Sequence, residues 1–247
     1  KRVVFAEAEH YKILKAAQQV NDEGIAIPIL LGRKQKITDL INEFSIEFDD
    51  LIIIDPKDDS QKKKRDEYGD ILWCKRKRKG LTQFEARKLM RERNYFGSMM
   101  LETGEADALI SGISRNYRTT IKPALEVIGK QDDVKRVAGM YIMNTKKGTL
   151  FLADTTINTN PSIEELVQMS EMIAKKVKKF NIIPRLALLS YSNFGSTRTE
   201  GSSKMAKATA LLKERNPNLI VDGEIQADFA LDADKTSGIF PFSSLAE

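Results

Sequence analysis

The sequence predicts an α/β protein in which strands and helices alternate on mostly parallel sheets. Short runs rich in Val, Ile and Leu recur along the chain, and segments with helical periodicity separate them. A chain of 247 residues is also long enough for one or two such domains with sizeable cores. The predicted strands are 3–5, 25–31, 51–54, 108–110, 136–143, 149–153, 186–190 and 219–225.

In the first half of the chain, residues typical of helix ends predict two helices. Thr82 and Glu85 have the spacing of a capping box, which predicts a helix from there through Met90. A second helix over 95–103 ends at Gly104. We expect its Met and Phe side chains in the core rather than in a ligand site.

In the second half, a helix is expected over 161–179. Asn160 is predicted as its N-cap and Pro161 as its first residue, and its apolar residues follow the 3.6-residue period. Another helix over 199–213 is closed by the Asn-Pro pair at 216–217.

A polar turn at 131–133 separates two series of strands and helices. We therefore expect a first α/β domain at 1–132 and a second at 133–247, with a cleft between them as the usual place for a ligand. The first residues lie inside a strand-like segment, with no leading Met and no signal-peptide pattern. We expect the sequence to be a domain cut from a longer chain.

The composition is that of a globular protein, with 41% hydrophobic and 30% charged residues. No apolar run approaches the roughly 18 residues that a membrane helix needs, so we expect a soluble, cytoplasmic protein without a membrane partner. Cys74 and His10 are the only cysteine and histidine, which excludes internal disulfides, Cys/His zinc sites and most histidine-centred catalysis. Cys74 lies in a basic helical stretch, and we interpret it as an ordinary thiol.

The positive charge is concentrated in one segment. Residues 57–79 contain ten Lys/Arg and five Asp/Glu, whereas the whole chain has a net charge of +5. Such a segment is able to bind nucleic acid or another polyanion through phosphate contacts. Only Tyr68 and Trp73 offer aromatic stacking there, so a solvated helix face is preferred and no nucleic-acid partner is expected.

Several common motifs are absent from the sequence. No G-x-G spacing supports a dinucleotide fold, no G-x-x-x-x-G-K supports a P-loop, and no G-x-S-x-G supports a nucleophile elbow. What remains is a set of strand-to-loop junctions rich in small and hydroxyl residues.

The first junction lies within residues 106–125. A strand ends at Ser111 and Gly112, and Thr119 or Thr120 is predicted to cap a helix that has Pro123 in its first turn. Free N–H groups and hydroxyls at a helix start suit a phosphate, and three cations add positive charge. These cations are Arg115, Arg118 and Lys122. The alternative is an ordinary connection with surface cations.

The second and third junctions lie at 188–202 and 221–232. In the second, a strand runs into a hydroxyl-rich loop before a helix. In the third, an acidic cluster lies near a strand end, and such a cluster is more often structural than functional. The residues of interest in the second junction are Ser190, Ser192, Asn193, Gly195, Ser196 and Thr197, and those in the third are Asp222, Glu224 and Asp228.

Together these segments resemble the phosphate acetyltransferase family, which carries versions of SG-x₅₋₆-T-x-RPAL, LS-x-S-x-x-GS and DGE-x-Q-x-D in this order. The similarity covers nearly the whole chain. The segments NYFGSMM (94–100), SYSNFGS (190–196) and Tyr117 resemble more closely the phosphotransacetylase-like C-terminal domain of NADP-dependent malic enzymes.

The resemblance implies a two-domain α/β architecture like that of isocitrate and isopropylmalate dehydrogenases. It also implies homodimers or larger homo-oligomers. The ligands that it implies are acetyl-CoA or CoA in the interdomain cleft and phosphate as a second anionic ligand. The positions that match the family motifs are Ser111, Gly112, Thr119, Thr120 and Lys122; Ser190, Ser192, Gly195 and Ser196; and Gly223, Glu224, Gln226 and Asp228. To these the candidate ligand site adds Arg115, Tyr117 and Asn193.

Two departures from the family pattern bear on catalysis. Lys122 stands where the family commonly has Arg, and an ammonium lacks the bidentate fork of a guanidinium. The family's catalytic Ser-Arg pair and following Asp are expected after FPFSSLAE, in a segment that also completes the first domain. No catalytic residue is therefore assigned in this sequence.

Two functions follow from the resemblance. The preferred one is an acetyl-CoA-binding regulatory domain fused to a malic-enzyme portion, which converts malate to pyruvate with NADP and a divalent metal bound outside these residues. The alternative is an active phosphate acetyltransferase. Polyanion binding through 57–79 ranks third.

Overall fold

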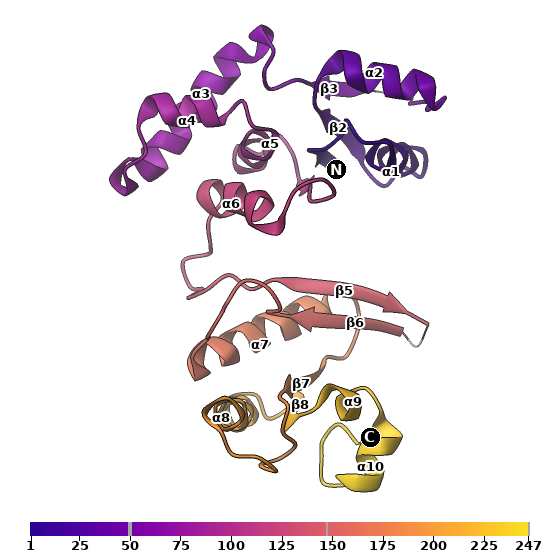
Figure 1. The fold of residues 1–247 in the computed structure, drawn as a ribbon, viewed down its shortest axis with the longest axis vertical. Helices are drawn as coiled ribbons and strands as arrows, with labels where there is room; N and C mark the ends of the chain where they lie inside the picture. The colour runs from indigo at the N-terminus through magenta and orange to yellow at the C-terminus, as the bar shows by residue number, and fades with distance from the viewer. Residues whose placement is uncertain (49–50, 147, 247) are drawn as a thin grey trace. The chain divides into compact units, whose positions relative to one another are not determined.

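The computed structural model describes residues 1–48, 51–146 and 148–246. The chain divides into two compact units, Lys1–Gly129 and Lys130–Glu247 (Figure 1). Strands and helices alternate along both units, so the predicted α/β class is confirmed.

Unit 1 contains a four-stranded sheet in which all neighbours are parallel. Its strands are β1 (Arg2–Phe5), β2 (Ile27–Leu31), β3 (Ile52–Ile54) and β4 (Ala108–Ile110), in the order β3-β2-β1-β4. The four carboxyl ends therefore lie along one edge. The chain order reverses between β1 and β4, and ligands of open α/β sheets bind at such a reversal.

Helices cover both faces of this sheet because successive strand residues point to opposite sides. Phe5 and Leu30 pack with α1 and α2, whereas Val4 and Ile29 pack with α3, α4 and α5. Phe96, Met99 and Met100 belong to the second cluster, as predicted. The helices are α1 (Tyr11–Asp22), α2 (Lys34–Glu43), α3 (Lys62–Arg76), α4 (Gln83–Leu89), α5 (Arg93–Glu102) and α6 (Tyr117–Val127).

The capping box predicted at the start of α4 is confirmed, with Thr82 as N-cap and Glu85 as its partner. The predicted start of α6 is wrong. Asn116 is the N-cap, because its Oδ1 accepts a hydrogen bond of 3.0 Å from the amide of Thr119. The helix therefore begins before both threonines, and Pro123 lies inside it rather than in its first turn.

Unit 2 contains two small sheets. An antiparallel hairpin joins β5 (Met140–Thr145) to β6 (Gly148–Ala153), and a parallel pair joins β7 (Arg185–Leu189) to β8 (Ile220–Ile225). The predicted strand at 136–143 starts too early, because the ladder with β6 begins only at Met140. The helices are α7 (Ile163–Lys178), α8 (Glu200–Arg215), α9 (Ala227–Ala230) and α10 (Ala233–Ile239).

The start of α7 also differs from the prediction. Ser162 is the N-cap and forms a reciprocal capping box with Glu165, so Asn160 and Pro161 precede the helix. Val167 of α7 packs in one core cluster with side chains of β7, α8 and β8. Among the described residues, no helix combines the length and the apolar character that crossing a membrane requires.

Candidate functional site

The loop that follows β4 wraps around a single carboxylate. The amides of Gly112 and Ile113 donate to Oε2 of Glu7 at 2.6 and 2.7 Å, and the amide of Ser114 donates to Oε1 at 3.1 Å. The Ser114 hydroxyl also donates to Glu7. The expectation that these N–H groups are free for a phosphate is therefore wrong, because Glu7 from the end of β1 fills the anion nest.

Glu7 is ionised in this position. Its side chain is almost fully buried, and burial by itself raises the pKa of a carboxyl. The hydrogen bonds from the Ser114 hydroxyl and the three amides outweigh burial and lower the pKa of Glu7 to about 2. The carboxylate therefore holds the loop between β4 and α6 in one shape at neutral pH.

Ser111 lies at the same end of the sheet. Its hydroxyl donates a hydrogen bond of 2.9 Å to Oδ1 of Asn94, which is the second residue of α5. Nδ2 of Asn94 is buried and has no hydrogen-bond partner among the described residues. The end of β4 thus keeps one unsatisfied donor beside a serine hydroxyl.

The other candidates in this segment have structural partners or face solvent. Arg115 pairs with Glu92 at 3.2 Å. The hydroxyls of Thr119 and Thr120 donate to the carbonyl of Asn116 at 3.0 and 3.1 Å. Tyr117 is 43% exposed. The two threonines therefore stabilise the start of α6, although the sequence favours them as ligand-binding residues.

Lys122 is exposed on α6. It lines a depression of about 740 Å³ formed with residues of α3, α4 and α5, among them Tyr95. Ser111 and Gly112 are not among the residues that line this depression.

In unit 2 the loop between β7 and α8 is anchored by Glu224, at the end of β8. Oε1 of Glu224 accepts hydrogen bonds from the amide of Gly195 at 2.5 Å and from the hydroxyl of Ser192 at 3.3 Å. The Glu224 carbonyl accepts from the amide of Phe194 at 2.9 Å. The structure therefore brings the second and third sequence junctions together, and the side chain of Glu224 is only 2% exposed.

Two further contacts fix the same loop. The side chains of Asn193 and Gln226 are joined at 2.7 Å, and Oδ1 of Asn193 accepts from the Gln226 amide at 2.7 Å. The hydroxyls of Ser192 and Ser196 lie 3.2 Å apart, and Oγ of Ser196 accepts from the Asn193 amide at 3.1 Å. Oγ of Ser190 accepts weakly from the amide of Ser192, at 3.4 Å. Most of the loop's hydroxyls therefore shape it.

What the loop leaves open is its outer rim and the start of α8. Gly195, Ser196, Thr197 and Arg198 are exposed. Among the described residues, the Arg198 side chain forms no salt bridge. A guanidinium beside the first turn of a 16-residue helix is suited to an anionic group.

Gly223 and Asp222 precede Glu224 in β8 and help to fix its position. Gly223 has φ of +140°, and a Cβ at this position would lie 2.5 Å from the carbonyl oxygen of Leu188. Burial raises the pKa of Asp222, but hydrogen bonds from the Lys213 ammonium and from Ser243 and Ser244 hold it below its usual value. Asp222 is therefore structural, in agreement with the view that such an acidic cluster is more often structural than functional.

Asp228 lies apart from this arrangement. It is exposed and pairs with Lys235 at 2.5 Å, and this hydrogen bond lowers its pKa. No contact connects it to Glu224 in the described part of the chain.

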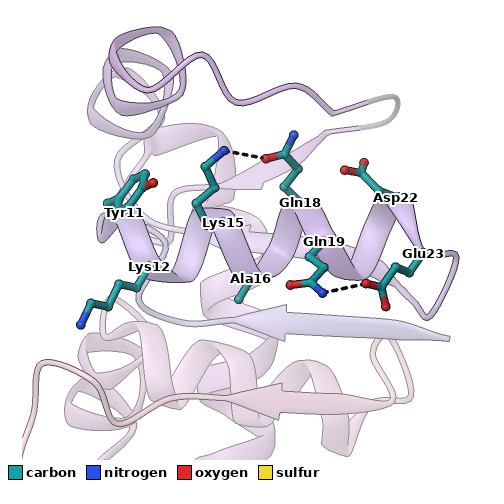
Figure 2. Close-up of a pocket in the computed structure, with 8 residues that line it drawn as sticks. All are labelled: Tyr11, Lys12, Lys15, Ala16, Gln18, Gln19, Asp22 and Glu23. Carbon is teal, nitrogen blue, oxygen red and sulfur yellow. Dashed lines mark hydrogen bonds between the residues drawn. The ribbon is translucent and has the colours of Figure 1, made fainter.

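A second depression, of about 650 Å³, lies along α1 (Figure 2). All of its lining residues belong to α1 or its C-cap, and two pairs of them, Lys15 with Gln18 and Gln19 with Glu23, are hydrogen-bonded along the helix. It contains no predicted site residue. In the described ranges, no group of three His, Cys, Asp or Glu side chains is placed to hold a metal.

Two residues of the site are missed by the sequence analysis. Glu7 follows the first strand in the alternating segment AEAE, and this placement at a strand's carboxyl end is a signal that identifies it as a candidate. Asn94 begins the segment 94–100 that the sequence analysis compares with malic enzymes, but only the fold brings α5 to the end of β4.

Comparison with known proteins shows where this chain has relatives. A family model described as phosphate acetyl/butaryl transferase matches residues 1–247. The NADP-dependent malic enzyme of Escherichia coli is 38% identical over 250 residues, covering 99% of this chain and 32% of that enzyme. The phosphate acetyltransferase of Clostridium acetobutylicum is 31% identical over 253 residues, covering 100% of this chain and 75% of that enzyme.

A solved structure supports the same relationship. The phosphotransacetylase from Streptococcus pyogenes has a TM-score of 0.81 and 31% identity, covering 98% of this chain and 73% of that one. The chain spans about a third of the length of the malic enzymes it matches.

Proposed function

We infer the function of this chain from its family, because the chain belongs to the phosphate acetyl/butaryl transferase family. We propose that this phosphotransacetylase-like domain binds acetyl-CoA and regulates a malic enzyme to which it is joined. The reaction of that enzyme, oxidative decarboxylation of malate to pyruvate with NADP and a divalent metal, belongs to the other part of the protein. We also propose that the protein is cytoplasmic and forms a homodimer or a larger homo-oligomer.

The observation that carries the proposal is the construction of the loop between β7 and α8. Buried Glu224 orients the loop through the Gly195 amide, while Arg198 remains exposed at the start of α8. This arrangement supports binding of an anionic thioester carrier, because the guanidinium and the helix start both favour negative charge.

In unit 1 the proposal assigns binding to groups that the fold leaves available. Glu7 occupies the amides of Gly112 and Ile113, so these amides position the loop rather than contact ligand. The exposed ammonium of Lys122 is the group that we assign to ligand binding.

The alternative, an active phosphate acetyltransferase, is favoured by a separate observation. The Clostridium acetobutylicum enzyme of that name aligns with the entire chain and with three quarters of its own length. In this reaction a phosphate oxygen attacks the thioester carbonyl, the C–O bond of acetyl phosphate forms, and the C–S bond breaks as CoA leaves and takes a proton.

One pair of measurements separates the two functions. Calorimetric titration measures acetyl-CoA binding, and a second assay on the same protein measures acetyl phosphate formation from acetyl-CoA and phosphate. Binding without turnover, together with a change in malic-enzyme rate on adding acetyl-CoA to the joined protein, supports the regulatory domain. Turnover supports the transferase, and absence of binding contradicts both.

A further inference from the structure

A buried serine holds the chain on both sides of Arg198, the exposed cation just before α8. Ser202 lies in the first turn of α8 and is 2% exposed. Its hydroxyl donates a hydrogen bond of 2.7 Å to the carbonyl of Thr197 and accepts one of 2.9 Å from the amide of Thr199. The backbone that carries Arg198 is therefore tied to the helix at the residue before it and at the residue after it.

A capping box explains one of these bonds but not the other. Thr199 and Ser202 form the box that opens α8, and each side chain accepts from the other residue's amide. The bond to the Thr197 carbonyl lies outside this box, two residues before the N-cap. An ionised Glu in place of Ser202 would complete the box but would have no proton to donate to that carbonyl. The hydroxyl of Ser202 therefore also ties the incoming loop to the helix.

Separate contacts hold the same two neighbours of Arg198 from the loop side. The amide of Thr197 donates to Oγ of Ser192 at 3.0 Å, and Ser192 is 1% exposed. The hydroxyls of Thr199 and Tyr191 lie 2.5 Å apart. Arg198 therefore lies between two residues that are each held by both α8 and the loop after β7.

A fixed backbone matters for an arginine that binds an anion. The side chain of arginine has many rotamers, and their loss on binding opposes affinity. Positioning the residue before the ligand arrives reduces this entropic cost. In the described ranges Arg198 forms no salt bridge, so its backbone is the part that the structure fixes.

We propose that Ser202 is a positioning residue, whose hydroxyl holds Arg198 in place for the anionic ligand. This inference rests on the proposed binding of acetyl-CoA at the loop after β7. A purely structural role for the hydroxyl is the alternative, and its effect on binding would not depend on the presence of Arg198. A double-mutant cycle separates the two roles, because it measures whether two side chains act through each other.

The first measurement needs no ligand. NMR relaxation of the full chain gives the order parameter of the Arg198 amide, which is about 0.85 for rigid backbone and below about 0.6 for flexible backbone. We expect the rigid value in the wild type and a decrease toward the flexible value in Ser202→Ala. Alanine favours helix, so α8 itself should persist in this variant. The matched control is Ser203→Ala, a change at the neighbouring, less buried serine, and it should keep the wild-type value.

A milder variant tests the same restraint from the loop side. Tyr191 is 57% exposed, so Tyr191→Phe removes the hydroxyl beside Thr199 and leaves the core unchanged. We expect a smaller decrease in the order parameter of Arg198 in this variant than in Ser202→Ala.

The second measurement is calorimetric titration of acetyl-CoA. Ser202→Ala is expected to weaken binding about fivefold when Arg198 is present and less than about twofold in the Arg198→Ala background. Ser203→Ala should bind acetyl-CoA like the wild type.

The outcomes separate this inference from the proposed function. An unchanged order parameter at Arg198 in Ser202→Ala overturns the inference whether or not acetyl-CoA binds. Equal weakening of acetyl-CoA binding in both backgrounds, or loss of the whole fold in Ser202→Ala, assigns the hydroxyl a structural role and also overturns it. A wild type that does not bind acetyl-CoA, while Ser202→Ala loses order at Arg198, contradicts the proposed function and leaves the positioning of Arg198 by Ser202 standing.

Discussion

The amide of Gly195 donates a hydrogen bond of 2.5 Å to the carboxylate of Glu224 and so ties the loop after β7 to the end of β8. This contact joins residues 29 positions apart and leaves the rim of the loop exposed. The shape of the loop therefore depends on a buried residue of a distant strand.

Replacing Glu224 by Gln tests this dependence. The amide side chain binds the Gly195 N–H less strongly than a carboxylate does, so the free energy of unfolding is expected to fall by about 1–3 kcal/mol, with about tenfold weaker acetyl-CoA binding. Denaturant unfolding and calorimetry measure the two effects. Glu214→Gln, an exposed change on α8, is the control and should leave both unchanged.

Gly223 should not tolerate a side chain. Its φ of +140° and the 2.5 Å approach of a Cβ to the Leu188 carbonyl predict that Gly223→Ala lowers the free energy of unfolding by about 2–5 kcal/mol. Gly238→Ala in α10 meets no atom within 4 Å and should be neutral or slightly stabilising. Equal unfolding midpoints for the two variants would contradict a close approach between residue 223 and the Leu188 carbonyl.

Glu7 predicts a pH dependence of stability. Its pKa is lowered from 4.5 to about 2 in the folded chain, so its contribution is complete above pH 4.5 and is lost as the pH falls toward 2. At pH 7 the wild type should exceed Glu7→Gln by about 1–3 kcal/mol in free energy of unfolding. This difference should shrink below pH 4.5. A difference that stays constant from pH 7 to about pH 3 would contradict the assigned role.

Lys122→Ala tests whether its ammonium contacts an anionic ligand. Acetyl-CoA binding is expected to weaken by about 1–3 kcal/mol if a charged hydrogen bond is lost. Lys12→Ala, on the exposed face of α1, is the matched control and should bind acetyl-CoA like the wild type. An unchanged dissociation constant for Lys122→Ala removes this residue from the site.

Much of the fold follows from local sequence patterns. The strand runs and the capping box at Thr82 are visible because apolar periodicity and helix ends depend on neighbouring residues. The cap of α6 is mispredicted because Asn116 accepts from the Thr119 amide and so starts the helix before either threonine. The late start of β5 depends on pairing with β6, which a single strand's sequence does not contain.

The site is less predictable than the fold for a physical reason. The sequence identifies hydroxyl-rich loops, but whether their donors are free depends on distant residues. Glu7 consumes the amides of Gly112 and Ile113 across more than 100 positions, and Gln226 holds Asn193. Prediction from motifs therefore finds the loops but not which of their donors are already occupied by other parts of the chain.

Calorimetric titration of acetyl-CoA into the full chain and into Arg198→Ala tests the central claim most directly. We predict saturable binding by the wild type that weakens about tenfold in Arg198→Ala, while Lys207→Ala, an exposed change on the same helix, binds like the wild type. Absence of binding by the wild type, or equal affinity in all three proteins, would contradict the assignment of the loop after β7 as the acetyl-CoA site.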